Sequence, residues 1–303
     1  MPSIPFLSYE DDVIRSTPVE KLIGPSAGEM LVEDVEIDRS PMSPELRRRL
    51  RFKKMPNLVQ TQVRLLPESV DAALIRPEIG SLVHPYLSHM VSTLFLISPA
   101  ISDAFLSGSP PWVLCVGVGG GPLLMSLRCH LGLRVLGVEA DDVVLSTARR
   151  HFGLVESEFL KIVIGDGIEF IKNYAMEISE SKLFHAIMVD LDEADPMSGV
   201  GAPPLEFLEK SVLLGARRAL HPDGILVVNT ISSIKDIYAR MIEILRSFFS
   251  ELYELEVENG ENCVVVATSS PIGSITKEMK HGHIFEKLKQ LSCDRFIDSM
   301  RKI

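Results

Sequence analysis

The pattern of apolar and polar positions changes character near residue 112. Downstream of that point, short continuous apolar runs alternate with stretches that have the apolar spacing of helices. Continuous apolar runs are typical of strands that are buried on both faces. We therefore predict strands at residues 112–118, 134–139, 160–164, 185–190 and 225–229. The helices between them are predicted at residues 122–129, 142–152 and 204–220, and from about residue 168; Asp141 or Asp142 is expected to cap the second of these helices. Strands that alternate with helices in this way form a parallel sheet covered by helices.

The region that follows has a different pattern. After a predicted helix at residues 234–249, two β-like runs, 252–257 and 263–268, flank Asn259 and Gly260. An Asn-Gly pair between two such runs is a strong signal for an antiparallel hairpin. The prediction is therefore an α/β fold with a Rossmann-like sheet of seven strands, mostly parallel, that ends in an antiparallel hairpin. This ending is typical of class I methyltransferases and not of dinucleotide dehydrogenases.

Residues 1–84 are richer in proline and charge than the rest of the chain. Two runs in this part, 30–37 and 58–65, alternate apolar and polar residues, as half-buried strands do. We predict a small β-rich extension over residues 1–84. A domain of residues 85–303 follows, and we expect it to end in a helical tail that begins near residue 272.

Basic charge is concentrated in one place, at residues 47–51 together with Lys53 and Lys54. The cluster is interpreted either as a solvated turn or strand edge, or as a contact for an acidic partner. The formal net charge of the chain is −10. This balance argues against nucleic-acid binding, which depends on the neutralisation of phosphates by Lys and Arg.

The remaining bulk features indicate a cytoplasmic protein without a membrane partner. The apolar stretch at residues 91–101, which overlaps a helix predicted at residues 85–97, is too short to cross a bilayer. The first residues lack the basic and apolar regions of a secretory signal. The four cysteines are widely spaced and do not form a metal-binding pattern, so we expect free thiols and no metal site.

A candidate cofactor site follows the strand predicted at residues 112–118. Gly117, Gly119 and Gly120 lie in a glycine-rich turn before a helix. Glycines at such a turn let the backbone approach a ligand closely, and the helix that follows offers N–H groups to polar atoms. A tight turn without a ligand would have the same sequence.

Two acidic positions at the ends of the next strands favour a ligand. Glu139 ends the second strand, where a carboxylate can accept from ribose hydroxyls, and Asp166-Gly167 follows the third, where a carboxylate can accept from an adenine amine. Each alone is interpreted more simply as a surface acid or a helix cap. Because ligands of open parallel sheets bind at these strand ends, the set predicts adenosine binding. The sequence has no GKS or GKT motif of a P-loop, which disfavours ATP as the ligand.

A candidate acceptor site follows the fourth strand, with Asp190, Asp192 and Asp195 in one loop. Carboxylates there can hold an amine and direct its lone pair, although they can also cap the next helix. Asn229, which ends the fifth strand, is a further candidate for contact with the acceptor. Gln60 is a candidate for contact with the donor, or else part of a strand edge.

These motifs resemble a known family. The stretches VGVGGGPLL, VEADDVVLSTARRHFG, GDGIEFI, MVDLDEADPMSGVGAPPLEFLE and HPDGILVVN resemble the spermidine-synthase-like branch of class I methyltransferases. More closely, they are similar to the C-terminal domain of the eukaryotic elongation factor 1-alpha lysine and N-terminal methyltransferases. The DxDxxDP loop followed by a Pro-Pro pair is the most specific element, and the resemblance covers nearly the whole chain.

The resemblance implies methylation of the N-terminal α-amine of elongation factor 1-alpha, with S-adenosylmethionine as the cofactor. It implies Gly117, Gly119, Gly120, Glu139, Asp166, Gly167 and Asp190 as cofactor-binding residues, Asp190 and Asp192 as catalytic residues, and Asp192, Asp195 and Asn229 as substrate-binding residues. It leaves the oligomeric state open.

Two alternatives remain. The polyamine aminopropyltransferases share the fold and the acidic loop. Pro122 departs from the aspartate that they carry at the glycine turn, and residues 84–89 resemble their Tyr-His-Glu segment only loosely. The second alternative is a scaffold that binds the cofactor without catalysis.

Overall fold

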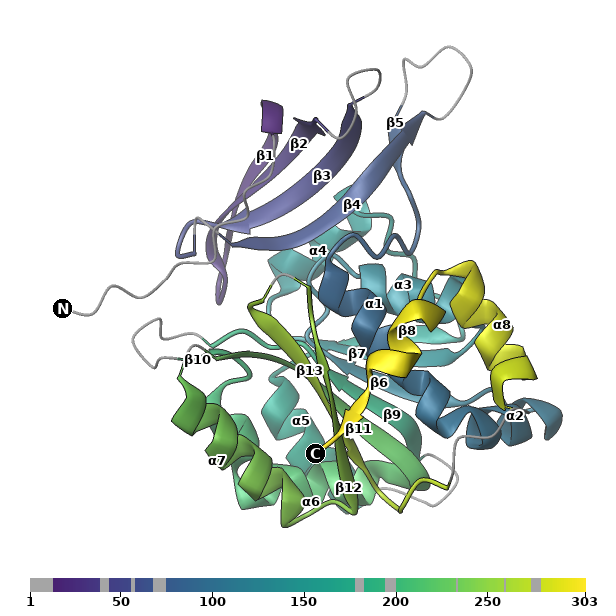
Figure 1. The fold of residues 1–303 in the computed structure, drawn as a ribbon. Helices are drawn as coiled ribbons and strands as arrows, with labels where there is room; N and C mark the ends of the chain where they lie inside the picture. Colours follow the sequence, from purple (N-terminus) through teal and green to yellow (C-terminus); the bar gives the residue numbers. More distant parts are fainter. Residues whose placement is uncertain are drawn as a thin grey trace.

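The chain folds into two β-sheets, and helices surround the larger one (Figure 1). The computed structural model describes residues 13–38, 44–55, 58–67, 75–177, 183–193, 200–232, 234–258, 260–273 and 279–303. The predicted division between residues 1–84 and 85–303 stays a prediction.

The larger sheet confirms the predicted fold class. Its core strands are β6 (Trp112–Val116), β7 (Arg134–Glu139), β8 (Leu160–Ile164), β9 (Phe184–Val189), β11 (Leu220–Ser232), β12 (Glu251–Glu256) and β13 (Asn262–Thr268). They lie in the order β12-β13-β11-β9-β6-β7-β8. Neighbours from β11 to β8 are parallel, whereas β13 is antiparallel to both β11 and β12. Two short strands extend the seven: β10 (Val200–Ala202) pairs with β11, and β14 (Arg301–Lys302) with β12.

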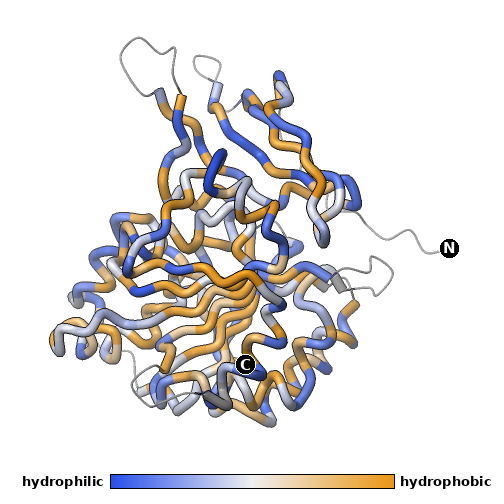
Figure 2. Tube along the Cα trace, turned by 180° about the vertical axis from the view of Figure 1, so that it is seen from behind, coloured by the Kyte–Doolittle hydropathy of each residue, from blue (hydrophilic) through white to orange (hydrophobic). Residues whose placement is uncertain are grey.

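Helices cover both faces of this sheet. Successive residues of a strand point to opposite faces, and because both sets are apolar here, each face needs its own cover. On β6, Val113 and Cys115 lie in one apolar core, and Leu114 and Val116 lie in the other. The first core includes α1 (Pro85–Ser92), η1 (Thr93–Ile97), α2 (Ser98–Leu106), α3 (Pro122–Cys129) and α8 (His283–Gln290). The second includes α5 (Gly167–Glu177), η3 (Leu205–Leu208), α6 (Lys210–Ala219) and α7 (Lys235–Arg246). Figure 2 shows the apolar strands in the middle of this assembly.

The helical run that begins at Pro85 is longer than predicted and continues to Leu106 through α1, η1 and α2. By length and composition alone, these 22 residues are the one described segment that could cross a membrane. Within the fold, 61% of its most apolar window is buried. Helices in the core of a protein pass the same test of length and composition.

The smaller sheet is an antiparallel meander in which each strand pairs with the next. Its strands are β1 (Val13–Gly24), β2 (Gly28–Ile37), β3 (Glu45–Phe52), β4 (Val59–Pro67) and β5 (Ile75–Pro77). One face packs Val32, Leu50 and Val63 against Val144 of α4 (Asp142–His151) and against Phe152. The two alternating runs predicted in this part are confirmed as β2 and β4.

The structure overturns both interpretations for residues 47–51 of the basic cluster, whereas Lys53 and Lys54 lie exposed in the turn after β3, as the first interpretation predicts. Residues 47–51 lie in β3, the middle strand of the sheet, and not in a turn or at an edge. Arg47 and Arg49 are only 3% and 4% exposed. Arg47 pairs with Glu45 at 2.6 Å, and Arg48 with Asp34 at 2.7 Å. Because burial of a charge is costly unless it is paired, these side chains are part of the fold and do not present a surface to an acidic partner.

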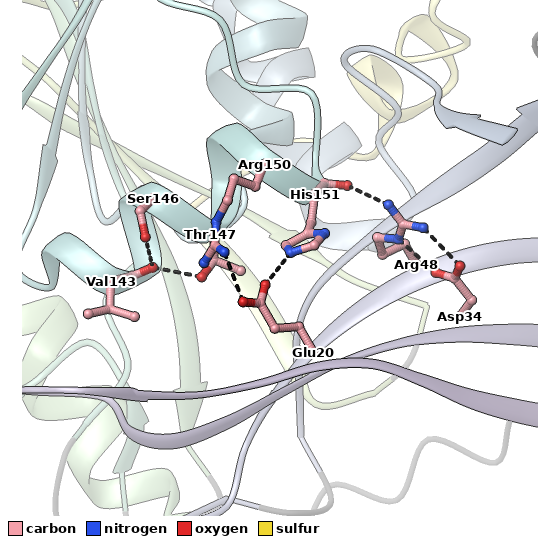
Figure 3. A network of polar contacts seen from close by, with 8 residues as sticks. All are labelled: Glu20, Asp34, Arg48, Val143, Ser146, Thr147, Arg150 and His151. Carbon is pink, nitrogen blue, oxygen red and sulfur yellow. Dashed lines mark hydrogen bonds and ion pairs between the residues drawn. The ribbon is translucent and has the colours of Figure 1, made fainter. Parts of the chain in front are cut away.

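Ion pairs join the smaller sheet to α4 (Figure 3). Glu20 of β1 accepts from Arg150 at 2.8 Å and lies 2.5 Å from the His151 ring nitrogen. Beside it, Arg48 donates to the carbonyl oxygen of His151 at 3.4 Å. The hydrogen bond to His151 is the main reason that the pKa of Glu20 lies below its usual value; partial burial opposes it, and Arg150 adds to it.

We expect the substitution Glu20→Gln to lower the free energy of unfolding at pH 7 by about 0.5–1 kcal/mol, because it removes a partly exposed charge from two pairs. A depressed carboxyl pKa contributes stability above its unfolded value and loses it as the pH falls through the folded pKa. In urea denaturation, the difference between variant and parent should therefore be constant near neutral pH and shrink as the pH falls below the usual carboxyl pKa of 4.5. The matched control is Glu29→Gln, which removes an exposed pair with Lys53 and should change stability less. An equal loss in both variants would contradict the prediction.

Candidate active site

A cleft lies at the carboxyl ends of β6, β7, β9 and β11, and the smaller sheet forms its opposite wall. It encloses about 1410 Å³, the part open to solvent included. Eight of the predicted site residues line it: Gln60, which lies on the inner strand β4 and not on an edge, and Gly117, Gly119, Glu139, Gly167, Asp190, Asp192 and Asn229. Gly120 and Asp166 are not among the lining residues, and Asp195 lies outside the described part of the chain. The roles of all these residues stay predictions.

In the glycine-rich turn at residues 117–121, neighbouring chain segments leave no room for a side chain at two of the glycines. Gly117 has φ +87°, and a Cβ atom there would lie 2.1 Å from the carbonyl oxygen of Asp190. A Cβ atom on Gly120 would lie 2.3 Å from Cγ2 of Thr61, whose hydroxyl accepts the Gly120 N–H at 2.9 Å. Glycine is thus required at these two positions because β9 and β4 approach the turn closely.

Glu139 ends β7 and turns its carboxylate onto the glycine turn. It accepts the N–H groups of Val118 at 3.2 Å, Gly119 at 3.1 Å and Asp141 at 3.1 Å. Burial raises the pKa of Glu139 above its usual value, and these three hydrogen bonds oppose the shift. A carboxylate has about four acceptor positions, so Glu139 retains capacity for a ligand hydroxyl.

Asp141 joins the smaller sheet to the rim of the cleft. One oxygen caps α4 by accepting from Val143 at 2.9 Å and Val144 at 3.3 Å, as expected for Asp141 or Asp142. The other accepts from Ser26 at 2.9 Å and Ala27 at 2.7 Å in the β1–β2 turn. Burial raises the pKa of Asp141, but the four N–H donors outweigh burial and hold it below the usual value. The sequence indicated only the capping role.

Asp166 and Gly167 lie at the start of α5. The Asp166 carboxylate accepts from Ile168 at 2.8 Å and Glu169 at 3.0 Å, and the residue is exposed. This is the helix-capping arrangement that the sequence left open. Gly167 is buried in the cleft, where a Cβ atom would lie 2.2 Å from Cγ1 of Val116.

Asp190 is held from both sides at the floor of the cleft. Its Oδ2 accepts from the hydroxyl of Tyr86 at 3.0 Å, and its Oδ1 accepts from Nδ2 of Asn229 at 2.9 Å. Asn229 in turn accepts from Asn262 at 2.8 Å. Burial raises the pKa of Asp190, and the bonds from Asn229 and Tyr86 moderate the shift. The network fixes the orientation of the carboxylate before any substrate binds.

Sequence reasoning did not find Tyr86, Thr61 or Asn262. The segment at residues 84–89 carried a signal for Tyr86, but it was interpreted as a departure from the aminopropyltransferases. Thr61 and Asn262 lie within ordinary strands, and only their partners across the fold reveal what they do.

Asp192 lies next to Asp190 in the cleft and has a strongly shifted pKa. Burial and the charge of Asp190 raise the pKa of Asp192 to about 7, against smaller opposing effects of Gln60 and Lys54. A carboxyl group with such a pKa can accept a proton near neutral pH, as a general base must. The arrangement can therefore bind a cationic group or hold an amine and take its proton. Among the described residues, His, Cys, Asp and Glu side chains do not form a group of three or more that could hold a metal ion.

A sequence model of the spermine/spermidine synthase domain matches residues 99–254, just over half of the 303 residues. The chain belongs to this family. A curated relative, the eEF1A lysine and N-terminal methyltransferase of Xenopus laevis, is 28% identical over 281 residues, which are 86% of this chain and 39% of the relative. The chain spans about two fifths of the length of the curated relatives that it matches.

Solved structures of similar proteins share the fold. Human methyltransferase-like protein 13, solved in complex with SAH, is 25% identical with a TM-score of 0.61; the match covers 70% of this chain and 92% of that one. A probable spermidine synthase from Corynebacterium glutamicum is 14% identical with a TM-score of 0.56, and the match covers 89% and 87%. The second likeness shows the fold alone.

Proposed function

We propose that this chain is an S-adenosylmethionine-dependent methyltransferase that methylates the N-terminal α-amine of a protein, elongation factor 1-alpha. The observation that carries the proposal is the pair Asp190 and Asp192. One carboxylate is oriented by Tyr86 and Asn229, and the other has a pKa of about 7, in a cleft at the strand ends. The curated relatives named eEF1A lysine and N-terminal methyltransferase support the acceptor, and the neighbour solved with SAH supports the cofactor.

The residues of the cleft fit this cofactor. Glu139 has acceptor capacity left for a ribose hydroxyl, and Gly117 and Gly119 keep side chains out of the space beside it. The carboxyl groups that line the cleft attract a sulfonium ion. When it is bound, the cofactor supplies an electrophilic methyl group.

The choice of an α-amine over a lysine amine follows from the cost of deprotonation. An α-amine has a pKa of about 7.7–8.0, so removal of its proton at pH 7 costs about 1 kcal/mol. A lysine amine at about 10.4 costs about 4–5 kcal/mol. A carboxyl group with a pKa of about 7, such as Asp192, matches the smaller demand. In this mechanism Asp190 holds the amine in line with the methyl group, and Asp192 receives its proton. Orientation of this kind can supply several kcal/mol.

The test is transfer of labelled methyl groups from S-adenosylmethionine to elongation factor 1-alpha with a free or an acetylated N-terminus. We expect label on the free form alone. Label on both forms would indicate a lysine acceptor.

The family match makes aminopropyl transfer the second candidate. Transfer from decarboxylated S-adenosylmethionine to putrescine, without methyl transfer, would establish it. Cofactor binding without any transfer would indicate a scaffold.

The pH dependence tests the role of Asp192. Because the carboxylate form must receive the proton, we expect kcat to fall about tenfold per pH unit below pH 7. The measurement uses saturating acceptor, since the free amine itself titrates near about 7.7–8.0 and affects kcat/KM. In Asp192→Asn, the fall of kcat below pH 7 should disappear, and kcat itself should be lower than in the parent. An unchanged fall in this variant would assign the titration to another group.

A further inference from the structure

The charges that line the cleft are unbalanced. Carboxyl groups line it at six described positions: Glu139, Asp141, Asp190, Asp192, Glu193 and Glu261. Among the described lining residues, Lys54 has the only ammonium or guanidinium group. His84 also lines the cleft, but burial and the nearby charges of Arg49 and Arg47 lower its pKa to about 3, so it is neutral near pH 7. A cleft with this balance attracts cations and repels a carboxylate, except at Lys54.

The glycine turn has little capacity to bind an anion. The N–H of Gly117 donates to Val138, and that of Gly121 donates to Val118. Those of Val118 and Gly119 donate to Glu139, and that of Gly120 donates to Thr61. The helix that follows begins with Pro122, which has no N–H group. A negatively charged ligand group therefore has to find its partner outside this turn.

Lys54 lies on the wall of the cleft that the smaller sheet forms, where its ammonium group could bind an anionic part of a ligand. It follows β3 in the β3–β4 turn, and its Nζ donates to the carbonyl oxygen of Ser26 at 3.4 Å. Ser26 is also bound to Asp141, so this ammonium group lies at the rim near Glu139 and Asp141. It acts electrostatically on Asp192 across the cleft. The side chain is exposed, and its one hydrogen bond to a carbonyl leaves two of its three donors for a ligand.

We propose that Lys54 binds the α-carboxylate of the amino-acid part of the donor and thereby selects carboxylated over decarboxylated donors. This inference rests on the proposed function, because S-adenosylmethionine carries such a carboxylate. The donor's ammonium and sulfonium groups face the carboxyl-lined part of the cleft, and its carboxylate faces the one cation. Lys54 acts here as a specificity-determining residue that binds the part of the donor remote from the transferred methyl group.

The test compares two ligands that differ only in the carboxylate: S-adenosylhomocysteine and its decarboxylated analogue. Their affinities are measured by calorimetry at low salt for the parent chain and for Lys54→Met, Lys54→Arg and Lys53→Met. We expect the parent to prefer S-adenosylhomocysteine by about tenfold, as for one charge-assisted contact, and Lys54→Met to lose this preference. Lys54→Arg should retain most of it. Lys53 is the matched control because it pairs with Glu29 and does not line the cleft.

Three results would overturn the inference. A preference that persists in Lys54→Met would place the carboxylate elsewhere, for example at the first turn of α3. Equal weakening of both ligands in that variant would mean that Lys54 supports only the shape of the cleft. A parent chain that binds neither ligand would overturn the proposed function together with this inference. The first two results would overturn the inference alone, so the two failures are distinguishable.

Discussion

Replacement of Asp190 by Asn is expected to lower the rate of methyl transfer by about 100-fold or more. The variant keeps the size of the side chain but removes the charge that orients the amine and stabilises its developing positive charge. It also keeps both neighbours in contact, because the amide oxygen can accept from Asn229 and the amide NH2 group can donate to the hydroxyl of Tyr86, which also accepts. The effect should appear in kcat rather than in KM, because it acts on the reacting amine.

Binding of S-adenosylhomocysteine separates this loss from misfolding. We expect the affinity of Asp190→Asn to stay within about threefold of the parent, since the lining residues expected to hold the adenosine, Glu139 and Gly167 among them, are unchanged. Asp298→Asn is the control for loss of a carboxylate far from the cleft. It breaks only an exposed pair with Lys280 and should leave the rate unchanged. A rate in Asp190→Asn within tenfold of the parent would remove this residue from the mechanism.

The largest effect on stability is expected for Gly117→Ala. Its Cβ atom would meet the carbonyl oxygen of Asp190 at 2.1 Å, a contact that neither backbone segment can relieve by rotating a side chain. The left-handed backbone adds a cost of about 1–2 kcal/mol. With the overpacking, we expect a loss of about 2–5 kcal/mol in the free energy of unfolding, together with weakened cofactor binding.

Gly28→Ala is the matched control for this prediction. Gly28 has φ +72°, close to the φ of Gly117, but a Cβ atom there would meet nothing within 4 Å. It should therefore show the backbone cost alone, about 1–2 kcal/mol. Denaturation curves of both variants give the comparison. Equal losses would mean that the turn can move away from Asp190, and would refute the close contact as the reason for glycine.

The periodic pattern was sufficient for the larger sheet because most of its strands are continuous apolar runs; inner strands such as β6 and β9 are buried on both faces, whereas the edge strand β8 is partly exposed. Runs such as residues 134–139 and 160–164 need no distant partner to be recognised, and they coincide with β7 and β8. The pattern was insufficient at residues 47–51. Four arginines in five positions indicate a solvated surface, yet partners on β2, β3 and β4 (Asp34, Glu45 and Gln62) allow β3 to be an inner strand.

In the candidate site, too, the sequence predicted the positions of residues better than their partners. Glu139, Asp190 and Asp192 were recognisable because the ends of parallel strands meet at one edge of a sheet, so their positions along the chain predict that they lie near one another. Asp166 was recognisable in position but not in role, since its carboxylate caps α5.

The sequence by itself determined the order of strands and helices, the Rossmann-like class and the acidic strand ends, because these depend on local periodicity and on the geometry of parallel sheets. Only the tertiary structure decided which distant side chains form hydrogen bonds with the strand ends and with the glycine-rich turn. Tyr86 contacts Asp190 across 104 positions of the chain, and Thr61 contacts Gly120 across 59. Contacts over such separations depend on how α1 and the smaller sheet are placed against the larger sheet, and they leave no periodic signal in the sequence.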